Sequence, residues 1–112
     1  MCDRAKTMVA NQLKNRGIVN TDVLCAMSLV ERHLFVSGIY RSIAYTDNPL
    51  PIGHGQTISQ PYVVGLMTEL LQVEKTNKVL EIGTGCGYQT AILSILSNKV
   101  ITLEVLSNLS KQ

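Results

Sequence analysis

The sequence predicts an α/β fold, because strand-like and helical segments alternate in its second half. Residues 79–82 and 100–104 are short, mostly apolar segments typical of parallel strands. Apolar residues recur at helical spacing between them, which predicts a strand–helix–strand unit over residues 78–104 with a right-handed crossover. Three alternating glycines, Gly83, Gly85 and Gly87, separate the first strand from this helix.

Length and composition limit the kinds of protein that could contain this unit. A chain of 112 residues suits one domain, and 46% hydrophobic residues allow a packed core. Charged residues make up 16% with a net charge of +2 and no basic run, which argues against nucleic-acid binding. No apolar run approaches the roughly 18 residues of a membrane-spanning helix, and we expect no signal peptide.

The cysteines indicate the compartment. Cys2, Cys25 and Cys86 are odd in number and widely spaced, without a second cysteine or a histidine at a zinc-binding spacing. We therefore expect reduced thiols in a cytoplasmic protein that has no metal site.

Two helices are predicted near the N-terminus. The first covers residues 4–16 and is ended by Gly17. Thr21 or Asp22 is expected to cap the second. The expected buried faces are Ala5, Met8, Val9 and Leu13 for the first helix, and Val23, Ala26, Met27, Val30 and Leu34 for the second.

Residues 40–60 are expected to be irregular, because Asn48-Pro49, Pro51 and several glycines interrupt regular structure. Pro61 fits the first turn of a third helix, and residues 74–77 form a polar turn after it. The apolar side of this helix is expected to be Val63, Leu66, Met67, Leu70 and Leu71, with Met67 in the core.

The strand at residues 79–82 is of the kind that is buried on both faces of a parallel sheet. With only two strands, however, we expect one apolar face of the unit to lack cover. The helix after the glycines begins near Tyr88, and Ser97-Asn98 ends it. Its apolar stripe is Tyr88, Ala91, Ile92, Ile95 and Leu96.

The glycine segment indicates a ligand site. Glycine allows a tight turn and a close approach of ligand to backbone, and the helix start offers free N–H donors. Dinucleotide enzymes use G-x-G-x-x-G here, whereas Tyr88 stands where the third glycine of that pattern would be. This spacing disfavours a nicotinamide-dependent oxidoreductase.

Two acidic residues complete the pattern. Glu81 precedes the glycines, and Glu104 ends the second strand, where an acid can accept hydrogen bonds from ribose hydroxyls. E-x-G-x-G-x-G with a distal acid resembles motif I of S-adenosylmethionine-dependent methyltransferases. A tight turn without a ligand is the simpler interpretation, but the glycines together with the placed acid favour a cofactor.

A second segment narrows the resemblance. "LPIGHGQTISQPYVVGLMTELL", together with "VLEIGTGCGYQTAIL", closely resembles the protein-L-isoaspartate O-methyltransferase family, and "ERHLFV" is also similar. The resemblance extends over nearly the whole chain to about Glu104, and "GQTISQP" is its most specific part.

The resemblance implies a Rossmann-like class I methyltransferase fold that binds S-adenosyl-L-methionine. The implied reaction is repair: methylation of the free carboxylate of L-isoaspartyl residues in damaged proteins. Ser59 would be the active-site residue beside that carboxylate. The implied cofactor-binding residues are Thr57, Ile58, Glu81, Gly83, Thr84, Gly85, Gly87 and Glu104. The resemblance also implies a monomer that acts on protein or peptide substrates, without nucleic acid or membrane.

The implied chemistry needs few catalytic groups. A carboxylate is already anionic at neutral pH, so no strong general base is needed. Catalysis would depend on the alignment of oxygen, methyl and sulfur and on water exclusion. Ser59 would then hold the carboxylate and not act as a nucleophile. The simpler interpretation of Ser59 is loop capping before the helix at Pro61.

The resemblance implies an incomplete fold: the N-terminal helices and the first strand–helix–strand unit. We expect one truncated methyltransferase domain over residues 1–112, made of helices and the active-site loop (1–60), the start of the cofactor-binding unit (61–104) and a tail (105–112). A fragment of a longer protein, a truncated gene and a partner chain that completes the sheet all remain open. A non-catalytic remnant that binds cofactor weakly, or serves as an interaction module, is the alternative function.

Overall fold

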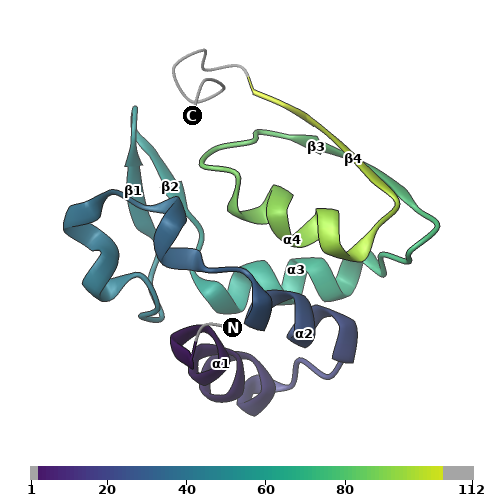
Figure 1. Cartoon of the computed structure of the whole chain (residues 1–112), viewed down its shortest axis with the longest axis horizontal. Helices are drawn as coiled ribbons and strands as arrows, with labels where there is room; N and C mark the ends of the chain where they lie inside the picture. Colours follow the sequence, from purple (N-terminus) through teal and green to yellow (C-terminus); the bar gives the residue numbers. More distant parts are fainter. Residues whose placement is uncertain (1–2, 105–112) are drawn as a thin grey trace.

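The computed structural model describes residues 3–104. Its helices form a core, and a small two-stranded sheet packs on one side of that core (Figure 1). In Figure 1, α4 (Tyr88–Leu96) lies between a small sheet of β3 (Lys78–Ile82) and β4 (Lys99–Leu103) and the other helices. Those helices are α1 (Asp3–Met8), α2 (Thr21–Leu29) and α3 (Pro61–Leu71). A separate hairpin, β1 (Leu50–Gly53) and β2 (Gln56–Ile58), stands beside the loop between β3 and α4.

The first predicted helix is confirmed, although its hydrogen-bonding pattern changes along its length. α1 continues as a π-helical turn over Val9–Leu13 and a 3₁₀ turn over Lys14–Arg16. Gly17 then ends it with φ of 97°, a left-handed conformation that glycine adopts at little cost. The predicted face is buried, since Ala5 and Leu13 are both fully inaccessible to solvent.

The cap and the length of the second helix differ from prediction. Asn20 caps α2, because its side-chain oxygen accepts hydrogen bonds from the Asp22 and Val23 amides at 3.0 and 3.1 Å. The prediction of Thr21 or Asp22 was therefore wrong. α2 ends at Leu29, so Leu34 falls in a later 3₁₀ turn and is exposed.

Residues 40–60 are more regular than expected. Gly38–Ile43 forms a 3₁₀ helix, and β1 and β2 form an antiparallel hairpin. Pro51 is tolerated in β1 because a two-stranded hairpin has only edge strands. The connecting residues Gly53, His54 and Gly55 all have positive φ, which closes the turn.

The third helix forms where predicted but packs on a different face. α3 begins at Pro61 as predicted. On its predicted apolar side Val63 and Leu66 are half-buried, whereas Met67, Leu70 and Leu71 are 57–70% exposed. Gly65 explains the rotation, because a Cβ there would lie 2.8 Å from the Leu13 Cδ2 atom. The buried face consists of Pro61, Val64, Gly65 and Thr68, whose small side chains let α3 approach the first helix closely. The expectation of Met67 in the core was wrong.

The strand–helix–strand unit has the predicted parallel pairing, with Lys78 opposite Lys99 and Ile82 opposite Leu103. α4 buries the predicted stripe, and Tyr88 and Ile92 are almost fully inaccessible. The first strand is not buried on both faces, and the uncovered apolar face expected of a two-stranded unit is confirmed. α4 covers one face only, and the other carries exposed apolar side chains: Leu80, Ile82, Ile101 and Leu103.

Two sequence expectations can be checked elsewhere. Cys25 and Cys86 are free thiols, while Cys2 and the predicted tail at 105–112 lie outside the described residues. Within residues 3–104, every helix is too short or too polar to cross a lipid bilayer.

Candidate active site

A cleft of about 320 Å³ lies where the hairpin segment meets the glycine turn. Its volume is in the range of small-molecule sites. Seven of the nine predicted site residues line it: Thr57, Ile58, Ser59, Glu81, Gly83, Thr84 and Gly85. Six further residues complete the walls: Val64, Met67, Ile82, Cys86, Tyr88 and Gln89.

The glycine turn forms one wall of the cleft through its backbone. Gly83, Gly85 and Gly87 have φ values of 90°, 56° and 91°, which side-chain-bearing residues rarely adopt. The carbonyl of Leu103 holds the turn in place by accepting hydrogen bonds from the amides of Gly83 and Thr84 at 2.7 and 3.2 Å. A Cβ on Gly83 would meet no atom within 4 Å, so the backbone here is open to a close ligand.

Glu81 is held by hydroxyl groups from two elements. Its Oε1 atom accepts hydrogen bonds from Thr90 on α4 and from Thr102 on β4, the latter at 2.8 Å. Because the Thr102 proton is used on Glu81, the hydroxyl of Thr84 donates to that of Thr102 at 2.6 Å. The Glu81 carboxylate is thus fixed in the cleft wall, and Oε2 has no hydrogen-bond partner within residues 3–104.

Glu104 and Gly87 are near the cleft but do not line it. The amide of Gly85 donates to Oε1 of Glu104 at 2.7 Å, so this acid braces the glycine turn from the end of β4. Gly87 is the N-cap residue of α4, and a Cβ there would lie 3.9 Å from the ring of Phe35. Both residues therefore support the glycine turn from outside the cleft.

Ser59 is exposed at the mouth of the cleft, just before α3. The N-cap position of α3 is Gln60, and no side-chain hydrogen bond caps this helix. Among the described residues, nothing pairs with the Ser59 hydroxyl. The structure therefore gives no support to a capping role and leaves this hydroxyl free to contact a ligand.

A buried cluster that was not predicted from the sequence packs against the wall of the cleft. The guanidinium of Arg32 lies 4.9 Å from the centroid of the Tyr88 ring, and Tyr88 packs edge-on against Phe35. Burial raises the pKa values of the Tyr88 hydroxyl and the Cys86 thiol, and it lowers that of Arg32. Arg32 falls in "ERHLFV", so its place in a quoted motif was the available signal.

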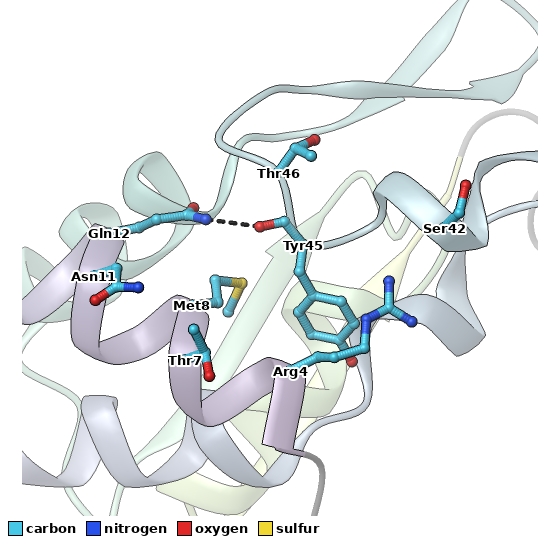
Figure 2. A pocket seen from close by; sticks show the side chains of 8 residues that line it. All are labelled: Arg4, Thr7, Met8, Asn11, Gln12, Ser42, Tyr45 and Thr46. Carbon is cyan, nitrogen blue, oxygen red and sulfur yellow. Dashed lines mark hydrogen bonds between the residues drawn. The ribbon is translucent and has the colours of Figure 1, made fainter.

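A second hollow, of about 270 Å³, lies between the N-terminal helix and residues 42–46 (Figure 2). Two of its polar side chains make hydrogen bonds, although the buried Oε1 atom of Gln12 has no partner within residues 3–104. Arg4 stacks 4.6 Å from the ring centroid of Tyr45 and donates to the carbonyl of Arg41 at 2.6 Å. Gln12 donates to the Tyr45 carbonyl at 2.7 Å. None of the predicted site residues lines this hollow, so the cleft at Ser59 remains the candidate active site.

The cleft suits an organic cation better than a metal ion. No group of three or more potential metal ligands gathers within the described part of the chain. Sulfonium and ammonium groups would be attracted to the fixed carboxylate of Glu81, and the open backbone at Gly83 allows close contact. The residues present therefore fit a compact nucleoside cofactor with an amino-acid tail.

The chain matches the family model "Protein-L-isoaspartate(D-aspartate) O-methyltransferase (PCMT)" over residues 3–112. It is 57% identical over 100 residues to protein-L-isoaspartate O-methyltransferase 2 of Shewanella sediminis, a match that covers 89% of this chain and 41% of that protein. It is 53% identical over 110 residues to the enzyme of Methanoregula boonei, covering 98% and 51%. The chain thus spans about half the length of the curated relatives it matches.

Solved structures give the same relationship. A Plasmodium falciparum protein assigned as a protein-L-isoaspartate O-methyltransferase, in complex with S-adenosyl-L-homocysteine, superposes with a TM-score of 0.82 at 32% identity. That match covers 96% of this chain and 51% of the other. A second protein-L-isoaspartate O-methyltransferase gives a TM-score of 0.83 at 27% identity, covering 95% and 36%. The predicted Rossmann-like methyltransferase fold, in incomplete form, is thereby confirmed.

Proposed function

The chain belongs to the protein-L-isoaspartate(D-aspartate) O-methyltransferase family, and on that premise we propose that it contributes to methyl transfer from S-adenosyl-L-methionine to the free carboxylate of L-isoaspartyl residues. The observation that carries the proposal is the shared cleft. Ser59 and the glycine turn, more than 20 residues apart in sequence, line the same 320 Å³ space. A reaction that joins a bound cofactor to an incoming carboxylate needs this juxtaposition.

The cofactor side of the cleft would be the glycine turn with its two acids. Glu81 would face the ammonium of the cofactor's methionine end through its unpaired oxygen, because Oε1 is occupied by threonine hydroxyls. The backbone of Gly83, Thr84 and Gly85 would form the floor. Glu104 is positioned by its bond to the Gly85 amide, beside the turn where a ribose would lie. The bound cofactor supplies an electrophilic methyl group.

The acceptor side would be the segment at residues 57–59. The free hydroxyl of Ser59 would donate a hydrogen bond to one carboxylate oxygen and leave the other to meet the methyl group. Thr57 and Ile58 would line the junction between acceptor and cofactor. No residue has to remove a proton, since the acceptor is already anionic near pH 7.

The expected setting follows from the same premise. We propose damaged proteins or peptides with L-isoaspartyl residues as partners, a monomeric state and a cytoplasmic location. The free thiols of Cys25 and Cys86 support a reducing compartment. Division into a helical part (1–60), a cofactor-binding unit (61–104) and a tail (105–112) is likewise proposed.

Because the chain spans about half the length of its curated relatives, a non-catalytic cofactor-binding module is the second candidate. Isothermal titration with S-adenosylhomocysteine and with NADH, followed by a radiolabelled methyl-transfer assay on an isoaspartyl peptide, separates the candidates. Binding plus transfer supports the enzyme, and binding without transfer supports the module. Absence of S-adenosylhomocysteine binding contradicts both.

A further inference from the structure

Arg32 connects the loop that carries Ser59 to the rest of the site. It begins the 3₁₀ turn after α2 and is completely buried. Its Nε atom donates to the carbonyl of Ala44 at 2.6 Å, and its Nη2 atom donates to the carbonyl of Ser59 at 3.0 Å. The backbone of Ser59 is thus held from inside the protein while its side chain faces the cleft.

The same guanidinium supports the opposite wall of the cleft. Its Cζ atom lies over the ring of Tyr88, 4.9 Å from the ring centroid. Tyr88 is the first residue of α4 and directly follows the glycine turn. One buried side chain therefore contacts both the acceptor segment and the start of the helix that carries the cofactor turn.

No acid among residues 3–104 forms an ion pair with Arg32. The single ion pair among residues 3–104 joins Arg16 to Asp47, and Arg32 Nη1 has no hydrogen-bond partner in that range. The titratable groups that act on Arg32 are the hydroxyls of Tyr88 and Tyr45 and the Cys86 thiol, and none of them is a carboxyl group. The Tyr88 hydroxyl is near the guanidinium, but their geometry falls short of a hydrogen bond.

An unbalanced buried cation is costly, and an anion placed nearby reduces that cost. Ser59 is where the acceptor carboxylate would arrive, and its carbonyl is already in contact with the cation. Coulomb attraction in a poorly hydrated site is stronger than in bulk water. The carboxylate would therefore be favoured over a neutral group of the same shape.

We propose that Arg32 is the positioning residue for the methyl acceptor: it fixes the Ser59 backbone against the Tyr88 wall, and its unpaired positive charge favours an anionic acceptor over a neutral one. This inference rests on the proposed function, since the acceptor is the carboxylate placed there by that proposal. Arg32 acts through Ser59 and needs no direct contact with substrate.

Arg4 provides a control for the loss of an arginine that contacts a tyrosine ring elsewhere in the same chain. Its guanidinium also lies beside a tyrosine ring, that of Tyr45, as Figure 2 shows. It donates a hydrogen bond to the carbonyl of Arg41. It lies in the second hollow and does not line the cleft. Arg4→Met therefore removes a tyrosine contact and one carbonyl hydrogen bond away from the candidate site, although Arg4 is exposed and Arg32 is buried.

Hydrogen exchange followed by mass spectrometry tests the positioning role in the whole chain. In Arg32→Met, amide exchange over residues 57–60 should accelerate roughly tenfold, the usual effect of losing a hydrogen bond to a charged group. Exchange in β3 should stay within about threefold of the wild type. Arg32→Lys, which keeps the charge and is the milder change, should give a smaller acceleration. The inference is overturned if amide exchange accelerates equally at residues 57–60 and in β3 in both Arg32→Met and Arg32→Lys. It is also overturned if exchange at residues 57–60 does not accelerate.

Acceptor discrimination tests the charge. With S-adenosylhomocysteine present, calorimetry compares an isoaspartyl peptide with the same peptide carrying a carboxamide in place of the acceptor carboxylate. The preference for the carboxylate should fall roughly fivefold or more in Arg32→Met and persist in Arg32→Lys and Arg4→Met, while cofactor affinity changes little. An unchanged preference in Arg32→Met contradicts the inference alone, whereas a wild type that binds neither cofactor nor peptide contradicts the proposed function.

Discussion

The helical region buries its apolar side chains far more completely than the strand–helix–strand unit does. In the helical region Leu13, Ile18 and Met27 are fully inaccessible to solvent. On the outer face of the β3–β4 sheet, Leu80 and Ile82 are more than 60% exposed. The chain therefore has one well-packed core, in the helices and α4, and one sheet face that contributes little to its own stability.

This difference in burial indicates how each region supports the candidate site. The cleft lies at the junction, with Ser59 on the helical side and Gly83 on the sheet side. Arg32 is anchored in the well-packed region and reaches both walls through Ser59 and Tyr88. We therefore expect core substitutions to lower global stability and turn substitutions to act mainly on ligand binding.

The largest expected effect separates the two apolar regions. Leu13→Ala should lower the free energy of unfolding by about 2–5 kcal/mol, because a fully buried leucine leaves a cavity. The matched change Leu80→Ala, at a side chain that is 62% exposed, should stay within about 0.5 kcal/mol of the wild type. Urea denaturation followed by circular dichroism measures both. Similar losses in the two variants would show that the sheet face is covered in solution.

A smaller effect is expected in the glycine turn. Gly83→Ala introduces a side chain at φ of 90° and should destabilise the fold by about 1–2 kcal/mol. It should also weaken S-adenosylhomocysteine binding, because the new methyl group occupies the open space beside the backbone. Gly38→Ala is the control, since a Cβ there meets no atom and the backbone is not left-handed. Thermal melting with and without ligand gives both quantities, and equal ligand shifts in the two variants would exclude Gly83 from the site.

The smallest effect concerns the cysteines. Burial raises the pKa of the Cys86 thiol, so a smaller fraction of this thiol is ionised at pH 8 than of an ordinary thiol. Iodoacetamide should therefore alkylate Cys86 several-fold more slowly than the exposed Cys25. The folded protein holds the Cys86 proton more tightly than the unfolded chain. Its contribution to stability is therefore full below the ordinary thiol pKa of about 8.5 and declines as pH rises through the raised value.

Peptide mapping of a Cys2→Ser variant measures the two alkylation rates. Saturating S-adenosylhomocysteine should slow Cys86 further, since this residue lines the cleft, and leave Cys25 unchanged. Faster labelling of Cys86 than of Cys25 would contradict the described burial.

Periodicity predicted element types better than it predicted which faces are buried. The helix at Pro61 and the stripe beginning at Tyr88 follow from apolar spacing and turn residues alone. The buried face of α3 does not, because Gly65 allows a close helix contact that favours small side chains over Met67. The hairpin was missed because Pro51 normally excludes a strand, and only its edge position permits it.

The candidate site was predictable wherever a motif carries it. Glycines with positive φ and the flanking acids are local signals, and the structure places them at one turn. The contacts of Arg32 with Ala44 and Ser59 are not local, since they join residues 12 and 27 positions apart. No pattern in the sequence specifies that this arginine is buried without an acid partner.

The most direct test of the account is a ¹H–¹⁵N NMR titration of the chain with S-adenosylhomocysteine. We expect the largest amide shift changes at residues 57–59 and 83–88, smaller ones at Glu104 and none in the second hollow around Arg4 and Tyr45. Saturable changes confined to the second hollow, or no changes at residues 83–88, would contradict this expectation.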